Sequence, residues 1–211
     1  MLVKITFAAS NNDMKRLSIF YCFAVGIILS TPLMSQEADY GRSSIRTGLG
    51  FGFNKGKRET GLGLQYVIGW QKEWGEKRRL RFNPNMMIGG YTPLFISGTR
   101  EQFYRVTHLE VIFHYDLLKV SSVSLVVSGG GFVAYSRGLL GTGGDGETYY
   151  DESKFFLRGY FGGSFSAAIR IAPKSSRWAG EIRPVNLQYG NEGFIMTYFM
   201  LGVDFKIRKK E

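Results

Sequence analysis

The chain has 211 residues, of which 28 are glycine, 5 are proline and 15% are aromatic. This length and composition predict one folded domain and exclude a disordered or fibrous polymer. The formal charge of +10 would suit a nucleic-acid partner, but the basic residues are scattered among predicted turns, so no nucleic acid is expected. The single cysteine, Cys22, excludes an intramolecular disulfide and a cysteine-based metal site.

Residues 1–35 are predicted to form a cleavable signal peptide. Lys15 and Arg16 precede an apolar run that ends near Leu29, and a cleavage region with Ser30, Thr31 and Ser35 follows, which is the three-part pattern of a secretory signal. Leu33 in this region is bulkier than the usual small residue. The run has about thirteen apolar residues, fewer than the roughly twenty of a membrane helix. We therefore expect cleavage before Gln36, with Met14 as an alternative start, and a single domain over residues 36–211.

The mature chain contains segments of period two, with apolar side chains on one parity and small or polar side chains on the other. In chain order they run from Ile45 to Phe53, Leu62 to Gln71, Leu80 to Gly89, His108 to Leu117, Ser122 to Tyr135, Leu157 to Ile171, Trp178 to Tyr189 and Ile195 to Ile207. This pattern predicts eight β-strands. Their even number is typical of a closed barrel that crosses the bacterial outer membrane.

Two of the eight segments are irregular. Pro84 interrupts the third segment, and because proline cannot donate to a strand ladder, a bulge or irregularity is expected there. The seventh segment places Glu181 and Arg183 on one parity and Ile182 and Pro184 on the other. Its register is not fixed by the pattern.

The lengths of the segments and of their connections indicate a membrane protein. Segments of roughly ten residues or more exceed the five or six that are typical of soluble strands. Long connections, Thr92 to Gln102 and Arg137 to Lys154, alternate with short ones, Lys119 to Ser121 and Pro173 to Arg177. The sequence therefore predicts an all-β, antiparallel, up-and-down transmembrane barrel whose short turns face the periplasm.

The apolar parity is expected to face lipid. The other parity holds glycine, serine and isolated charges, which suit a narrow lumen. A soluble periplasmic carrier of the lipocalin type would invert this arrangement, with its apolar parity inside, and stays an alternative.

The chain from Gln36 to Ile207 resembles the family of small outer-membrane barrels that includes the OmpA membrane domain and OmpX. The resemblance rests on the signal peptide, the alternating segments and the last strand, where Phe205 lies near the end as in the terminal strand that the barrel-assembly machinery recognises. Here Lys206 to Glu211 follow this aromatic residue. The resemblance implies a bacterial outer-membrane location, with outer-membrane lipid, lipopolysaccharide and, during insertion, the assembly machinery as partners.

Charged residues and histidines on the inward parity are expected to form one polar network in the lumen, because buried charges need partners. Its predicted members are Arg46, Arg81, His108, Glu110, His114, Asp116, Arg158, Arg170, Glu181, Arg183 and Asp204. The same histidines and carboxylates could serve in acid–base chemistry or as metal ligands. We nevertheless expect a structural network, with no catalytic residue, no metal and no cofactor.

Two further functions are compatible with such a barrel, beside the soluble carrier named above. A lipid-modifying enzyme is disfavoured because neither histidine is followed two residues later by the serine that outer-membrane deacylases carry; Glu110 follows His108 and Asp116 follows His114. A narrow channel is disfavoured because side chains fill an eight-stranded barrel. A structural or surface-interaction role is the prediction.

The connection between the fifth and sixth segments is the candidate recognition loop. It combines acidic and tyrosine side chains among glycines, at Asp145, Glu147, Tyr149, Tyr150, Asp151 and Glu152. Loops of this kind carry binding functions on rigid scaffolds. An extracellular partner is expected here, and a periplasmic partner could instead contact the basic turns at the other end.

Overall fold

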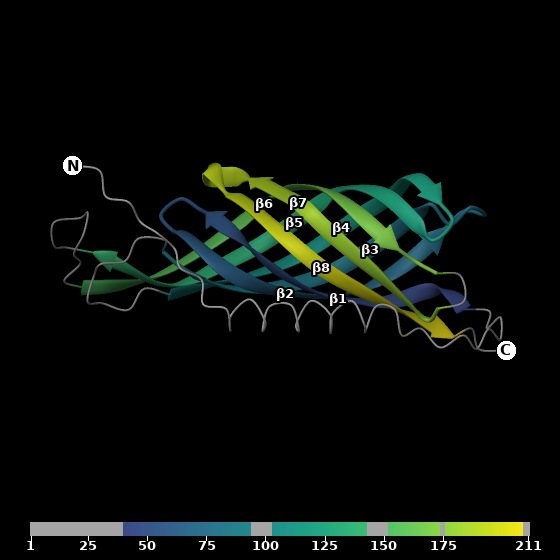
Figure 1. Cartoon of the computed structure of the whole chain (residues 1–211). Helices are drawn as coiled ribbons and strands as arrows, with labels where there is room; N and C mark the ends of the chain where they lie inside the picture. The colour runs from purple at the N-terminus through teal and green to yellow at the C-terminus, as the bar shows by residue number, and fades with distance from the viewer. Residues whose placement is uncertain (1–39, 94–102, 143–151, 174–175, 209–211) are drawn as a thin grey trace, which may run out of the picture. The chain divides into compact units, whose positions relative to one another are not determined.

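The structure is a computed structural model, and it describes residues 40–93, 103–142, 152–173 and 176–208. Eight antiparallel strands form a closed barrel in sequence order, with β1 closing on β8 (Figure 1). The strands are β1 (Tyr40–Lys55), β2 (Thr60–Trp74), β3 (Leu80–Thr92), β4 (Phe103–Val120), β5 (Val123–Thr142), β6 (Glu152–Ile171), β7 (Trp178–Gly190) and β8 (Ile195–Arg208). The predicted fold class is confirmed, whereas the predicted signal peptide lies outside the described residues.

The period-two pattern sets which side chains face outward. In β1, Leu49 is 67% exposed, whereas Arg46 on the other parity is 1% exposed. In β4, Leu109 is 58% exposed while its neighbours His108 and Glu110 are buried. The core of the molecule is therefore the lumen, and the outer wall is apolar.

Pro84 does not produce the register shift that a bulge would cause. The β2–β3 register is the same on both sides of the proline, since Gly69 pairs with Asn85 and Lys72 with Phe82. The irregularity is a gap in the ladder between these pairs. Asn83 Nδ2 donates to the carbonyl of Trp70 at 2.8 Å, so an amide side chain replaces the ladder bond that proline cannot make.

The seventh strand contains a genuine bulge. Its pairing with β8 shifts register between Arg183 and Asn186. Pro184 and Val185 are both exposed, whereas Arg183 and Asn186 are both buried. One additional residue therefore changes the parity of the inward positions within β7.

The connections differ between the two ends of the barrel. At one end, here the loop end, they comprise residues 56–59, 93–102, 143–151 and 191–194; at the other, the turn end, they comprise residues 75–79, 121–122 and 172–177. The predicted loop from Arg137 to Lys154 is wrong in its bounds, because β5 continues to Thr142 and pairs there with Glu152 of β6. The strand pairing between β5 and β6 continues from Arg137 and Leu157 to Thr142 and Glu152.

The β5–β6 hairpin extends beyond its neighbour on one side. Pairing between β6 and β7 begins only at Gly162 and Gly190. Residues 154–160 of β6 therefore pair with β5 alone among the described strands. In Figure 1, β5 and β6 reach furthest at the loop end.

No helix among the described residues has both the length and the apolarity to span a bilayer.

Candidate functional site

The lumen is divided into two layers of different chemistry. Near the turn end lies a cluster that we call the ionic layer, formed by Arg46, Arg81, Asp116, Arg170, Glu181, Arg183 and Asp204. Near the loop end lies the aromatic layer, formed by Tyr91, Tyr104, Phe132, Tyr160, Phe194 and Tyr198. Every member of both layers is buried.

Glu181 of β7 is the centre of the ionic layer. Its Oε1 accepts from Arg46 Nη2 at 2.8 Å and from Arg183 Nε at 2.5 Å, and its Oε2 accepts from Arg81 Nη1 at 3.3 Å. Because the three arginines come from β1, β7 and β3, a single carboxylate connects opposite walls of the barrel. Charge-assisted hydrogen bonds of this kind are among the stronger polar interactions in proteins.

The other two carboxylates of the ionic layer form ion pairs with Arg81 and Arg170. Asp116 Oδ1 accepts from Arg81 Nη2 at 2.8 Å, and Asp204 Oδ2 lies 3.1 Å from Arg170 Nη2. Gln71 links two of these groups, since its Oε1 accepts from Arg46 at 3.2 Å and its Nε2 donates to Asp204 at 3.3 Å. The layer is a connected network across the whole lumen.

His114 borders the ionic layer. Its Nδ1 lies 2.5 Å from the hydroxyl of Ser128, and Arg183 Nη2 lies 3.3 Å from its Nε2. A histidine next to a serine could in principle activate a nucleophile. Here both side chains are buried, and a cavity that Ser128 lines has a volume of about 10 Å³. A cavity of this size is too small for a lipid substrate.

The aromatic layer is packed ring against ring. The Tyr160 and Phe194 centroids lie 4.7 Å apart, those of Phe132 and Phe194 lie 5.4 Å apart, and Tyr91 stacks on Tyr104 at 5.4 Å. Such pairs add to the stability gained from burial. The sequence pattern suggested a lumen of small side chains, so this layer is a correction.

Inward glycines make room for these rings. A Cβ added at Gly52 would overlap the Cα and Cβ of Tyr198, and one at Gly63 would overlap the Tyr91 ring. The small and the large inward residues are therefore complementary across neighbouring strands. This explains why glycine is frequent on the inward parity.

Three of the predicted network residues lie apart from the ionic layer. His108 packs between Phe132 and Phe194, with centroid distances of 5.8 and 5.9 Å, and neither ring nitrogen has a hydrogen-bond partner within the described part of the chain. Glu110 accepts a hydrogen bond from Gln188 rather than from an arginine. Arg158 is half-buried near the loop end, opposite Ser136. The one predicted network is therefore a smaller ionic cluster with separate members above it.

The candidate recognition loop is mostly outside the described residues. Only Glu152 is described, as the exposed first residue of β6; the others, Asp145, Glu147, Tyr149, Tyr150 and Asp151, are not. Within the described part of the chain, no three His, Cys, Asp or Glu side chains are grouped as metal ligands.

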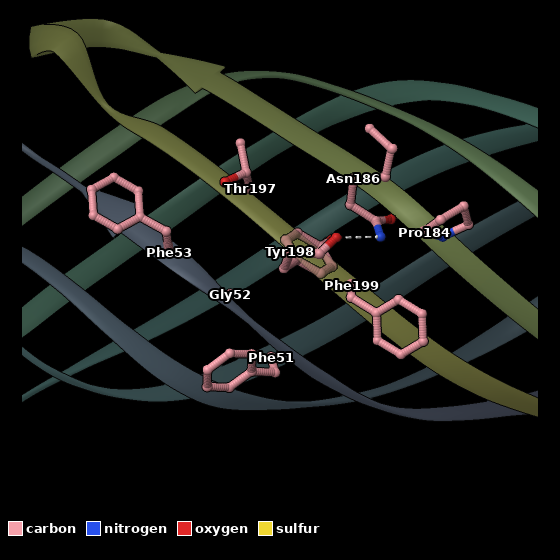
Figure 2. Close-up of a pocket in the computed structure, with 9 residues that line it drawn as sticks. Phe51, Gly52, Phe53, Pro184, Asn186, Thr197, Tyr198 and Phe199 are labelled. Carbon is pink, nitrogen blue, oxygen red and sulfur yellow. Dashed lines mark hydrogen bonds between the residues drawn. The ribbon is translucent and has the colours of Figure 1, made fainter. Parts of the chain in front are cut away.

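The β7 bulge opens a cavity of about 340 Å³ in the outer wall, shown in Figure 2. Its lining includes the rings of Phe51, Phe53 and Phe199. Asn186 closes the inner side, where its Nδ2 donates to the carbonyl of Tyr198 at 2.9 Å, the dashed line in Figure 2. The amide thus bridges β7 and β8 where the ladder is interrupted.

Sequence reasoning missed the amides and the rings of the lumen. Gln71, Asn186 and Gln188 all take part in polar contacts between strands. Alternation on β2 and β8 already puts Gln71 and Tyr198 on the inward parity, but neither was predicted as a member of the polar network. For Asn186 and Gln188 the bulge removes that signal, because it changes the parity of β7.

Comparisons with known proteins identify the fold. No protein-family model matches the chain, and no curated protein matches it either. The solved structure of Neisserial surface protein A is similar, with a TM-score of 0.51 and 12% identity over 79% of this chain and 98% of that chain. Ail of Yersinia pestis, in complex with the heparin analogue sucrose octasulfate, also gives a TM-score of 0.51 at 12% identity, over 80% and 99% of the two chains. The chain therefore has the fold of the small eight-stranded outer-membrane barrels.

Proposed function

We propose that this chain is a non-enzymatic barrel of the bacterial outer membrane that interacts with extracellular polypeptides through the unpaired edge of β6. The outer wall supports the membrane placement. Leu64 is 69% exposed, Phe161 64% and Leu201 51%, on strands around the whole barrel. A surface this apolar is stable in hydrocarbon, whereas a soluble carrier would expose it to water.

The occupied lumen argues against transport as the function. The ionic layer and the aromatic layer each extend across the barrel. A carrier needs an internal cavity of several hundred Å³, and a channel needs a continuous aqueous path. The side chains of the two layers occupy that space, so we assign the function to the surface of the barrel and not to its interior.

The edge of β6 is the observation that carries the proposal. Residues 154–160 pair with β5 and have no partner strand in β7. An unpaired edge presents N–H and C=O groups that can add a strand from another polypeptide. It lies at the loop end, which faces the outside in barrels with short periplasmic turns.

The direction of the free groups follows from one hydrogen bond. The N–H of Phe161 donates to Asn191 Oδ1 at 2.9 Å, on the β7 side. Backbone groups alternate between the two sides of a strand. The N–H groups of Phe155 and Leu157 therefore point to the open side, where an added strand would bind them.

This direction defines a sharp test. Full-length protein would be folded into lipid nanodiscs, and binding of a reduced, carboxymethylated polypeptide would be measured by surface plasmon resonance. Leu157→Pro removes one N–H group from the open edge of β6. It should weaken binding about fivefold, which is the effect of one lost hydrogen bond. Leu157→Ala keeps the N–H and is the matched control. Equal binding by the two variants would refute strand addition.

The cellular placement is tested separately. We propose export after cleavage between Ser35 and Gln36, insertion by the barrel-assembly machinery, and contact with lipopolysaccharide. Mass spectrometry of the mature amino terminus and membrane fractionation test these steps. Ail, a protein of the same fold, forms a complex with a heparin analogue, which supports an extracellular partner. Recovery in the soluble fraction would contradict the placement.

A further inference from the structure

Two arginines stand directly opposite each other on the outer wall. Arg105 of β4 pairs with Arg137 of β5, and both side chains are exposed. Directly opposed residues have Cβ atoms about 4.5–5.5 Å apart, and like charges there destabilise a sheet. Neither arginine has an ion pair with a carboxylate among the described residues. An anion bound between them would remove the repulsion.

The two arginines lie at a depth in the membrane that matches the lipid headgroups. On β4, every outward side chain between Arg105 and Lys119 is uncharged. This interval is about fourteen residues, and at a rise of about 2.5 Å per residue for a tilted strand it spans about 35 Å. The hydrocarbon core is about 30 Å thick, and the headgroups extend it to about 40–45 Å. Arg105 and Arg137 are thus at the outer headgroup layer, since they lie toward the loop end.

An apolar groove lies on the same strands, closer to the middle of the membrane. It has a volume of about 590 Å³, and Leu109, Gly131, Val133 and Phe161 are among its lining residues. Gly131 pairs with Gly163 of β6, so no side chain fills the groove at that point. Val133 is four residues from Arg137, about 13 Å along the strand.

We propose that a phosphorylated lipid of the outer leaflet binds this wall, with its phosphate between Arg105 and Arg137 and an acyl chain in the groove over Gly131. Guanidinium groups bind phosphate through two parallel hydrogen bonds, which a pair of arginines can supply from both sides. The inference rests on the outer-membrane placement proposed above and does not depend on a partner for β6.

The phosphate contact is tested with lipid A as the probe. Full-length barrel, shown to be folded by its heat-dependent gel mobility, would be incubated in detergent with bisphosphorylated lipid A, and retained lipid would be counted by native mass spectrometry. Arg105→Gln/Arg137→Gln should lower retention about tenfold, by loss of two charge-assisted contacts. Lys55→Gln/Arg58→Gln removes the same charge at the same end and should leave retention unchanged. Chemically dephosphorylated lipid A should bind wild-type protein as weakly as it binds the arginine variant.

The groove is tested with a matched pair of glycine variants. An added Cβ would lie 3.6 Å from the nearest atom at Gly131 and 3.9 Å at Gly129, so both positions accept a side chain. Gly131→Leu fills the groove and should lower retention, whereas Gly129→Leu lies outside its lining and should not. Loss of lipid in both the arginine and the Gly131 variants supports the site. Retention by a folded form of either variant, or equal binding of dephosphorylated lipid A, overturns it without affecting the barrel assignment.

Discussion

At the scale of single residues, Glu181 carries most of the connectivity of the lumen. It contacts arginines of three strands, and its side chain is 1% exposed. A guanidinium left without a partner in a buried site loses both its hydration and its counter-charge. The stability of the barrel should therefore depend on this one carboxylate more than on any charge at its rim.

Replacing Glu181 by alanine should lower the free energy of unfolding by about 3 to 5 kcal/mol, because three buried arginines lose an acceptor. Urea unfolding in phospholipid vesicles, followed by tryptophan fluorescence, measures this change. Glu73→Ala is the control, since Glu73 is 16% exposed and its arginine contacts are 3.8 and 4.0 Å long; its effect should stay below about 1 kcal/mol. Equal effects of the two variants would contradict the central role of Glu181.

A second prediction concerns the fit between glycines and rings. Gly52→Val would place a branched side chain against the backbone and Cβ of Tyr198, which cannot move without shifting β8. We expect the free energy of unfolding to fall by about 1 to 3 kcal/mol, as for other overpacked cores. This loss should lower the yield of folded barrel after refolding, which is measured from the band whose gel mobility changes on heating. Gly129 is exposed on the outer wall, so Gly129→Val should refold like wild type. A wild-type yield for Gly52→Val would show that the lumen is loosely packed.

The inward position of each charge was predictable, but its partner was not. Arg46 and Asp204 lie on the parity opposite the apolar side chains of their strands, so their parity alone places them inside. Which arginine meets Glu181 depends on the stagger of strands around the barrel, which no single strand encodes. For the same reason the sequence did not separate His108 from His114, although one packs among rings and the other beside Arg183.

At the scale of elements, the bulge in β7 is the feature that alternation could not locate. The inward parity changes between Arg183 and Asn186, so a strict period of two assigns one half of the strand wrongly. The extent of β5 and β6 was underestimated for another reason. Glycine and charged residues near Arg137 suggest a loop, but cross-strand pairing continues to Thr142 and Glu152 and overrides local preference.

Asn186 should be essential to the bulge. Asn186→Val removes the donor to the Tyr198 carbonyl, the bond dashed in Figure 2. The carbonyl then loses this partner where the register between β7 and β8 shifts. We expect a loss of about 1 to 3 kcal/mol in urea unfolding. Thr197→Val is exposed on the neighbouring strand and should change stability by less than about 0.5 kcal/mol. If both variants unfold alike, the amide does not bridge β7 and β8.

At the scale of the whole molecule, the two layers of the lumen act in series. Ions that pass the aromatic layer still meet the ionic layer, in which Arg46 and Arg81 share Glu181. A barrel of eight strands has an interior just wide enough for such side chains. We therefore expect that removal of one layer leaves the other in the path of an ion.

Planar-bilayer recordings test this arrangement. Wild-type protein should give no steady conductance. Phe194→Ala/Tyr198→Ala should give none either, because removing two rings opens space only in the aromatic layer. The buried ion pairs near the turn end stay in place. Combining that truncation with Glu181→Ala perturbs both layers, and here we expect brief, irregular current steps, since the unpaired guanidinium groups draw water into the lumen. Stable channels formed by wild-type protein would mean that the ionic layer opens in the membrane, and the scaffold role would then give way to conduction.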